Sequence, residues 1–250
     1  MDQKTVRPST GKFQAMNHGL NLKWCCSFNC HLPNGVINLS DEGKNELCFI
    51  SSHTVVLYNQ AEQTQSLLQG HSNAITSISF NKEKNIIITV DSGENCMMVV
   101  WSVEKAVPIR VVFNPDVCGI IAIDTSPDGK LAYTLSAPFE GSQRVRIWDW
   151  QNTDEDLPIK AEGELKLTNN LEFCTRIRAN ENDLNEFVTT GSALIRFWKV
   201  SANSCTSYNP KFSKKEGKKD NSLSKKFVET VFFTKDRECQ AVTGTEHGAL

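Results

Sequence analysis

Three cysteines and a histidine lie close together near the start of the chain: Cys25, Cys26, Cys30 and His31. Thiolates and imidazoles are the ligands that a structural zinc ion prefers. Such a site usually needs a second, well-spaced pair of ligands, and none follows in the sequence. We therefore predict neither a metal nor another cofactor, and interpret these thiols as reduced side chains, buried or half-buried beside a strand.

His71 and several aspartates are the other residues whose types could support catalysis. His71 could act as a general base, but no serine or cysteine nucleophile is marked beside it. Asp91, Asp128 and Asp149 each fall in or beside an expected turn, where a carboxylate caps backbone N–H groups. The sequence has no Gly-rich phosphate loop and no nucleophile motif. We therefore predict that the protein is not an enzyme and that His71 is a structural, hydrogen-bonding residue.

A lysine-rich segment, residues 211–226, is the unusual charged feature of the chain. It holds seven lysines against Glu216 and Asp220, a net charge of +5. Its low apolar content predicts a flexible insertion before the next strand. Two interpretations stay open, a plain solvated loop or a contact with an acidic partner. The candidate contact residues are Lys214, Lys215, Lys218 and Lys219.

The elements that carry these residues are indicated by a phrase that repeats along the chain. A strand-like run ending in Trp occurs at 97–101, at 144–148 and at 193–198, and an earlier copy at 54–58 ends in Tyr. Successive aromatic residues are 43, 47 and 50 residues apart. Short strands that recur at about 40–50 residues are typical of β-propeller blades. The fold class is therefore predicted as all-β, an incomplete β-propeller of about five blades or part-blades.

The second repeat gives the clearest strand pattern. Strands are expected at 74–80, 86–90, 97–101 and 107–113, separated by polar turns. The continuous apolar run at 86–88 suits a strand that is packed on both faces, as in stacked blades. In the third repeat, Pro127-Asp128-Gly129 predicts a tight turn between two strands.

These motifs resemble WD40 repeats. The resemblance rests on Gly70-His71 followed by Trp101, on Ser126–Gly129 followed by Trp148-Asp149, and on the run 243–250. It covers about residues 30 to 250 and implies a hydrogen-bonded set within a blade, here His71, Thr89, Asp91 and Trp101. The matching positions in other blades are Trp148, Asp149 and Trp198. Those blades lack part of the set, so we expect them to depend more on apolar packing.

The resemblance to WD40 repeats also determines the expected domain organisation. Residues 20–250 are predicted to form one partial WD40 propeller, with residues 1–19 as a disordered N-terminal tail. The run from His247 to Leu250 matches the start of a third strand whose aromatic residue does not follow. We therefore expect this chain to be a piece of a longer protein.

Further phrases resemble the WD-repeat proteins of motile cilia: 68–75, 90–96, 145–150 and Leu22-Lys23-Trp24. That resemblance implies a structural scaffold of the axoneme, the cytoskeleton of the cilium or flagellum. It implies a subunit of the calmodulin- and spoke-associated complex, near the base of a radial spoke on the doublet microtubule. The implied partners are other axonemal proteins and the microtubule, whose acidic surface would suit the lysine-rich segment.

The alternative is a WD40 substrate receptor of a ubiquitin ligase, or another cytoplasmic interaction scaffold. Substrate receptors often carry Trp-Asp-x-Arg at the end of a third strand, whereas Gln151 follows Trp148-Asp149-Trp150 here. Composition argues against two classes of partner, nucleic acids and membranes. A net charge of −2 argues against nucleic-acid binding through overall basicity. No apolar run approaches about 18 residues, so we predict no membrane partner either.

Overall fold

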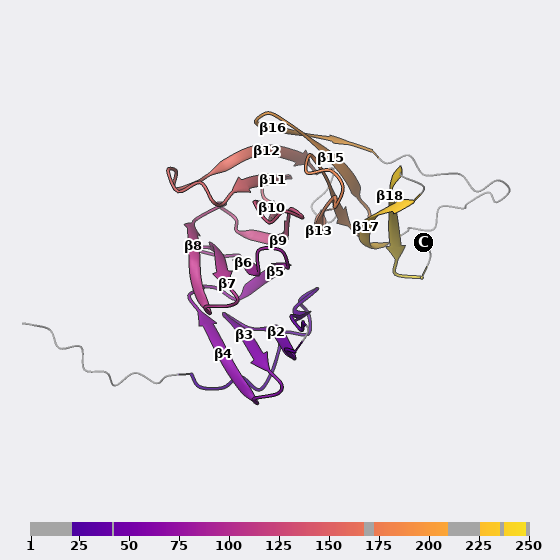
Figure 1. Cartoon of the computed structure of the whole chain (residues 1–250). Coiled ribbons are helices and arrows are strands. Elements are labelled where there is room, and N and C mark those ends of the chain that lie inside the picture. Colours follow the sequence, from indigo (N-terminus) through magenta and orange to yellow (C-terminus); the bar gives the residue numbers. More distant parts are fainter. Residues whose placement is uncertain (1–21, 42, 168–172, 210–225, 236–237, 249–250) are drawn as a thin grey trace, which may run out of the picture.

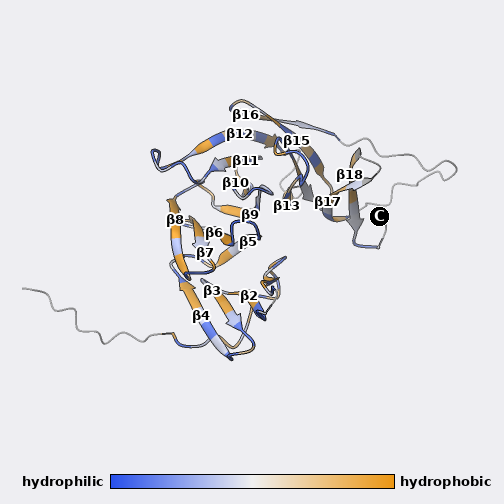
Figure 2. Cartoon of the chain, viewed as in Figure 1, coloured by the Kyte–Doolittle hydropathy of each residue, from blue (hydrophilic) through white to orange (hydrophobic). Residues whose placement is uncertain are grey.

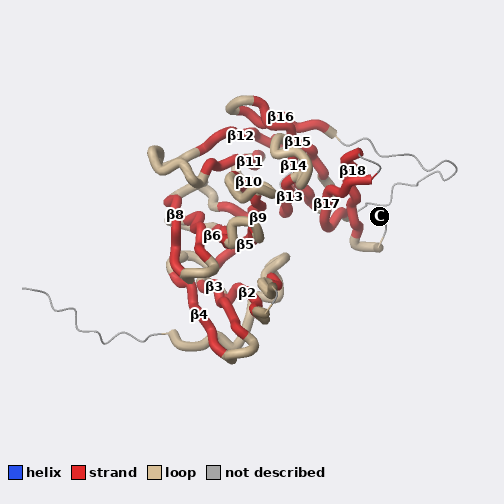
Figure 3. Tube along the Cα trace, in the orientation of Figure 1, coloured by secondary structure: helices blue, strands red, loops and turns tan. Residues whose placement is uncertain are grey.

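The computed structural model describes residues 22–41, 43–167, 173–209, 226–235 and 238–248. Over these ranges the chain consists of strands, turns and loops (Figure 3). No helix occurs in the described ranges, and so none there could cross a membrane. The predicted all-β class is confirmed.

Four blades of four strands follow one another along the chain, and a hairpin comes after them. Within each blade, consecutive strands pair antiparallel. The first blade holds β1 (Val36–Asn38), β2 (Glu46–Ser51), β3 (Thr54–Asn59) and β4 (Thr64–Gln69). The second holds β5 (Ile75–Asn81), β6 (Ile86–Asp91), β7 (Met97–Ser102) and β8 (Val107–Phe113).

The second half of the described chain repeats this arrangement. The third blade holds β9 (Ile120–Thr125), β10 (Leu131–Ser136), β11 (Ser142–Asp149) and β12 (Ile159–Lys166). The fourth holds β13 (Cys174–Ala179), β14 (Glu186–Gly191), β15 (Ile195–Ser201) and β16 (Ser204–Tyr208). The hairpin is β17 (Phe227–Lys235) with β18 (Glu238–Thr245). Four blades and a two-stranded part-blade agree with the expected count.

The blades are arranged in an arc (Figure 1). The first strands β5, β9 and β13 lie on its inner side, while the fourth strands β4, β8, β12 and β16 lie on its outer side. Neighbouring inner strands contact one another, β5 with β9, β9 with β13, and β13 with β17. On the outer side, a parallel bridge between Glu162 and Ser204 joins β12 to β16.

The hydrophobic cores lie between the blades, and Figure 2 shows apolar residues along many of the strands. The strand β6 illustrates the cause, because all six of its residues are buried. Ile86 and Ile88 belong to the core shared with the third blade, whereas Ile87 belongs to the core shared with the first. Successive side chains of a strand point to opposite faces, so a continuous apolar run fits a strand covered on both.

The repeated aromatic phrases form the third strands of their blades. Trp101 lies on β7, Trp148 on β11 and Trp198 on β15, and each is at most 2% exposed. Tyr58 lies at the matching place on β3. Each Trp packs into the core shared with the preceding blade. The indole rings therefore join neighbouring blades as well as filling their own.

The predicted turn at Pro127-Asp128-Gly129 connects β9 to β10. The carboxylate Oδ1 of Asp128 accepts hydrogen bonds from Ser126 Oγ at 2.6 Å and from Lys130 N at 3.1 Å. Gly129 has φ +66°, and a Cβ there would overlap with Asn81 and Lys84 of the preceding blade. Glycine therefore suits this position for two reasons, its backbone conformation and its closeness to the second blade.

Two predicted segments lie outside the described residues, so their expected structure stays a prediction. These are the tail 1–19 and almost all of the lysine-rich segment, where the described chain resumes only at Lys226. The candidate contact residues Lys214, Lys215, Lys218 and Lys219 are among those not described.

Candidate functional site

The second blade contains a closed set of buried hydrogen bonds. His71 Nδ1 lies 2.8 Å from Asp91 Oδ2, and His71 Nε2 lies 2.7 Å from Thr89 Oγ1. Trp101 Nε1 donates to the same Thr89 oxygen at 2.8 Å. Asp91 Oδ1 also accepts the backbone N–H of Met97 at 2.7 Å, which ties β6 to β7. The structure thus brings together the four residues of the expected set.

Hydrogen-bonding capacity determines the roles within this set. A carboxylate only accepts, so we assign the proton on His71 Nδ1 to the bond with Asp91. The indole N–H only donates, so Thr89 accepts from Trp101. Both ring nitrogens of His71 are therefore engaged inside the blade, and its side chain is fully buried. A histidine held in this way has no free nitrogen with which to take a proton from a substrate.

The third and fourth blades retain the Trp–Thr half of the set. Trp148 Nε1 donates to Thr134 Oγ1 at 2.8 Å, and Trp198 Nε1 donates to Thr189 Oγ1 at 2.9 Å. Each Thr lies two residues beyond the residue that faces the Trp across the sheet. Sequence reasoning missed both threonines. Their common place on the second strand of the repeat, equivalent to that of Thr89, is the signal that could have identified them.

The residue at the position equivalent to Asp91 differs from blade to blade. In the third blade it is Ser136, whose hydroxyl accepts the backbone N–H of Arg144 at 2.9 Å. In the fourth blade it is Gly191, where a Cβ would overlap with the carbonyl oxygen of Phe173. No side chain fits there, which explains why that blade cannot carry the acidic residue.

Stacked rings support the Trp of the fourth blade. Phe187 faces Trp198 across the sheet, and their rings stack with centroids 5.7 Å apart and planes 2° apart. The ring of Tyr133 in the third blade lies against Phe187, with ring centroids 5.5 Å apart. Its hydroxyl donates a hydrogen bond to Leu184 O at 2.8 Å. Burial raises the pKa of the Tyr133 phenol. This blade therefore depends on apolar and aromatic contacts in place of the His–Asp pair.

In the first blade, a segment from before the first strand covers Tyr58. The ring of Trp24 meets Tyr58 edge-on at 6.2 Å. The side-chain amide of Gln65 accepts from Cys25 N at 2.9 Å and donates to Cys25 O at 3.0 Å. This two-point contact holds the segment against the outer strand β4 as a short extra strand would be held.

The remaining candidate residues do not converge on one site. Asp149 ends β11, where its backbone N–H donates to Pro158 O at 3.0 Å. Asp128 belongs to the turn described above, and the hydrogen bond from Ser126 lowers the pKa of its carboxyl group. The described residues contain no group of three or more His, Cys, Asp or Glu side chains that could hold a metal ion.

The nine cysteines are all free thiols, although they differ in exposure. Cys25 is buried, but Cys26 and Cys30 are exposed, so the prediction of buried or half-buried thiols is wrong for these two. Burial raises the pKa of Cys48 to about 12 and that of Cys174 to about 11. Strand thiols of this kind stay protonated at neutral pH and pack as small apolar side chains.

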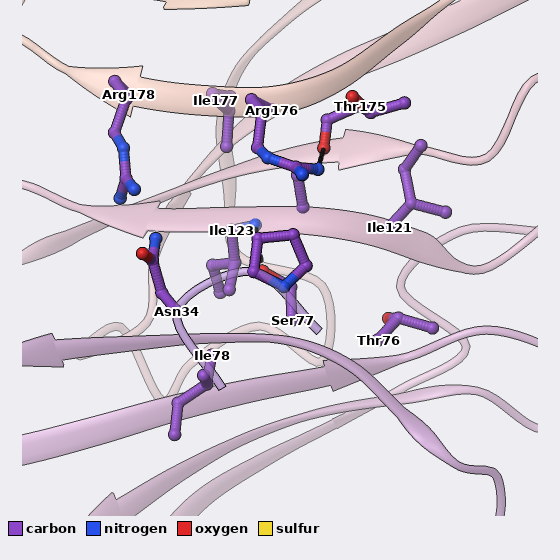
Figure 4. Close-up of a pocket in the computed structure, with 12 residues that line it drawn as sticks. Asn34, Thr76, Ser77, Ile78, Ile121, Ile123, Thr175, Arg176, Ile177 and Arg178 are labelled. Carbon is purple, nitrogen blue, oxygen red and sulfur yellow. Dashed lines mark hydrogen bonds between the residues drawn. The ribbon is translucent and has the colours of Figure 1, made fainter. Parts of the chain in front are cut away.

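A polar pocket lies on the inner side of the arc (Figure 4). The strands β5, β9 and β13 form one side, and the turn before β1 contributes Asn34. Arg176 and Arg178 of β13 extend into this space, beside the apolar Ile78 and Ile123. Three blades and the N-terminal turn thus contribute to a single pocket.

Glu229 of the hairpin pairs with both arginines. Arg178 Nε donates to Glu229 Oε1 at 2.8 Å, and Arg176 Nε lies 3.5 Å from Glu229 Oε2. Arg176 Nη1 also donates to Thr175 O at 3.0 Å. Burial lowers the pKa of Arg176, and the neighbouring Arg178 lowers it further, while Glu229 raises it. The site is a half-buried cluster with more positive than negative charge among these three groups.

Asp124 joins three blades beside this cluster. Its carboxylate accepts from Ser79 Oγ at 3.1 Å, from Thr125 N at 2.9 Å and from Ala179 N at 3.0 Å. Burial raises the pKa of Asp124, against the effect of Arg178 and of these hydrogen bonds. Sequence reasoning missed both Asp124 and the arginine pair, since no local motif marks them.

Four-stranded blades in an arc, with a Trp–Thr bond inside successive blades, define a WD-repeat β-propeller protein. Comparison with solved structures agrees at the level of fold. The crystal structure of a mitotic checkpoint complex superposes with a TM-score of 0.52 at 14% identity, covering 66% of this chain and 50% of that one.

The chain belongs to the family described as the CFAP251 N-terminal domain, which matches residues 20–250. Cilia- and flagella-associated protein 251 of Tetrahymena thermophila is 35% identical over 93% of this chain, and that of Chlamydomonas reinhardtii 30% over 92%. The chain spans only 23% and 29% of these two relatives. Human echinoderm microtubule-associated protein-like 4 is 24% identical over 92% of this chain and 22% of that protein.

Family membership confirms the resemblance to the WD-repeat proteins of motile cilia. It makes the chain a cilium- and flagellum-associated protein, which confirms the predicted localisation at that level.

Proposed function

We propose that this chain is part of a non-catalytic structural scaffold of the motile-cilium axoneme, within the calmodulin- and spoke-associated complex at the base of a radial spoke. The observation that carries the proposal is the closed hydrogen-bonded set of the second blade. There His71, Asp91 and Thr89 are engaged with one another and with the blade backbone. Polar side chains used in this way hold strands together, which is the chemistry of a rigid binding platform.

The relatives support the cellular setting of the proposal. Those in Tetrahymena and Chlamydomonas are named for cilia and flagella, and the human relative is named as microtubule-associated. We propose that the partners of this chain are other axonemal proteins and the doublet microtubule. Lys214, Lys215, Lys218 and Lys219 are the proposed contacts to an acidic surface.

Extraction and crosslinking of axonemes test this function. The protein would be tagged in ciliated cells, and cilia would be demembranated with detergent. We expect the tagged protein to stay with the axoneme, whereas a soluble matrix protein used as the control leaves it. Chemical crosslinking followed by mass spectrometry should then link the protein to subunits at the spoke base.

Three outcomes would contradict the proposal. Release with the soluble matrix would argue against a stable axonemal scaffold. Retention with crosslinks only to subunits far from the spoke base would keep the ciliary role and reject the assigned complex. Crosslinks to a ubiquitin ligase would favour the alternative, a substrate receptor.

A further inference from the structure

The arginine pair of the inner pocket has hydrogen-bond donors that remain unused. Glu229 takes the Nε groups of Arg176 and Arg178, and Thr175 takes one Nη group of Arg176. Within the described ranges, no acceptor is hydrogen-bonded to the other Nη group of Arg176 or to either Nη group of Arg178. Both side chains are 27% exposed, so a ligand that enters from solvent can reach these donors.

The neighbouring carboxyl group of Asp124 does not accept hydrogen bonds from these free Nη groups. Asp124 accepts hydrogen bonds from donors on three blades, Ser79, Thr125 and Ala179, and does not form an ion pair with Arg178. Its pKa is raised by burial, which favours the uncharged form of the carboxyl group. Among the residues that the structure describes, Glu229 is therefore the acidic side chain that pairs with both guanidinium groups.

The other polar groups of the pocket add few free hydrogen-bond acceptors. Thr76 Oγ1 donates to the carbonyl oxygen of Ile120, and Ser77 Oγ accepts from Ile123 N, so both hydroxyls are engaged. Asn34 and Arg178 extend toward one another across the pocket (Figure 4). The free groups are thus mostly donors, set against apolar walls that weaken screening by water.

We propose that this pocket binds a carboxylate side chain of an acidic peptide, held by the free Nη groups of Arg176 and Arg178. A carboxylate matches the planar donor geometry of a guanidinium and forms charge-assisted hydrogen bonds with it. The pocket lies between strands on the inner side of the arc, so an extended segment with a projecting side chain suits it better than a broad surface. The site goes beyond the proposed function, because its arginines are not among the lysines proposed there as contacts to an acidic surface.

Binding of a labelled hexaglutamate peptide to the full chain tests the inference by fluorescence anisotropy at low ionic strength. The double variant R176Q/R178Q should bind at least about tenfold more weakly, the expected loss of one or more charge-assisted hydrogen bonds. Arg144→Gln removes a charge from β11, outside the pocket, and should leave the affinity unchanged. A hexaglutamine peptide should not bind to the unmodified chain.

A second variant keeps the test independent of folding. Glu229→Gln removes the internal competitor for the two arginines, so we expect hexaglutamate to bind severalfold more tightly. Weaker binding in E229Q would mean that the cluster is only structural, and would overturn the inference. Equal losses in R144Q and in the double variant would overturn it as well.

Two further measurements separate this site from its alternatives. Replacing Lys214, Lys215, Lys218 and Lys219 with Gln should leave most of the binding intact, and abolished binding would assign it to the lysine-rich segment instead. A phosphoserine peptide that binds where hexaglutamate does not would reject a carboxylate ligand.

Discussion

At the scale of single residues, Thr89 is the point where the hydrogen bonds of the second blade meet. Thr89→Val keeps the shape of the side chain and removes its hydroxyl. The buried N–H of Trp101 and the Nε2 of His71 then both lose their partner. We expect a loss of about 2–3 kcal/mol in the free energy of unfolding, measured by urea denaturation.

Thr189 provides a matched control for that change. It is equally buried and accepts the indole N–H of Trp198, with the thiol of Cys174 as a second side-chain partner, but no histidine nitrogen depends on it. Thr189→Val should therefore cost about 1 kcal/mol. Equal losses for the two variants would show that His71 adds nothing to the stability of the second blade.

Asp124 predicts a pH dependence with a definite sign. Its folded-state pKa is raised above the ordinary 3.8, so the folded protein holds this proton more tightly than the unfolded chain does. The contribution of Asp124 to stability is therefore greatest at low pH and falls as the pH rises above 3.8 through the folded pKa.

Asp124→Asn tests this dependence because the amide does not titrate. In that variant the free energy of unfolding should lose the downward slope that Asp124 contributes in this pH range. Thermal melts of the variant and the unmodified protein across mildly acidic pH would measure the difference. A slope that is unchanged by the substitution would contradict the expected titration.

At the scale of elements, Gly191 shows how one position decides what a blade can contain. Gly191→Ala would place a Cβ against the backbone of Phe173 and Cys174, where β13 and β14 pair. We expect a loss of about 3 kcal/mol, because backbone atoms must move to make room. Gly244 on β18 has open space around its Cβ position, so Gly244→Ala should change stability by less than about 1 kcal/mol. Differential scanning calorimetry of both variants would check the contrast.

The strands could be predicted from the sequence because their signals are local. The run 107–113 was expected as a strand and forms β8, and the three Trp phrases form third strands. The Trp–Thr bonds of the later blades were missed because they depend on strand register, which a single strand does not show; aligning the repeats on Thr89 would have indicated both threonines. The inner pocket could not be predicted from local sequence signals at all. Its contacts join residues that are distant in the sequence, since Arg178 and Glu229 are 51 residues apart and Asp124 and Ala179 are 55 apart. Only the stacking of successive blades brings these residues together.

At the scale of the whole molecule, stability is shared between neighbouring blades. Each hydrophobic core contains residues from two blades, and the Trp on each third strand packs toward the blade before it. Asp124 and Glu229 extend the same coupling along the inner side of the arc. A defect in one blade should therefore weaken both of its neighbours, as in other architectures built by nearest-neighbour stacking.

We expect the lysine-rich segment to govern how the molecule meets an acidic surface. A net charge of +5 within residues 211–226 attracts such a surface over about 8 Å at physiological salt. Replacing Lys214, Lys215, Lys218 and Lys219 with Gln should weaken microtubule cosedimentation and flatten its dependence on salt. The melting temperature should stay unchanged if the segment adds little to the core.

A second set of four lysines tests whether position or total charge matters. Lys82, Lys84, Lys105 and Lys160 are exposed and lie on the second and third blades. Changing them to Gln removes the same charge from the molecule, so the net charge of the two variants is identical. We expect this control to bind microtubules nearly as well as the unmodified protein, because the attraction depends on charges gathered in one segment. Equal weakening in both variants would mean that overall charge alone governs the contact, and the lysine-rich segment would then be a plain solvated loop.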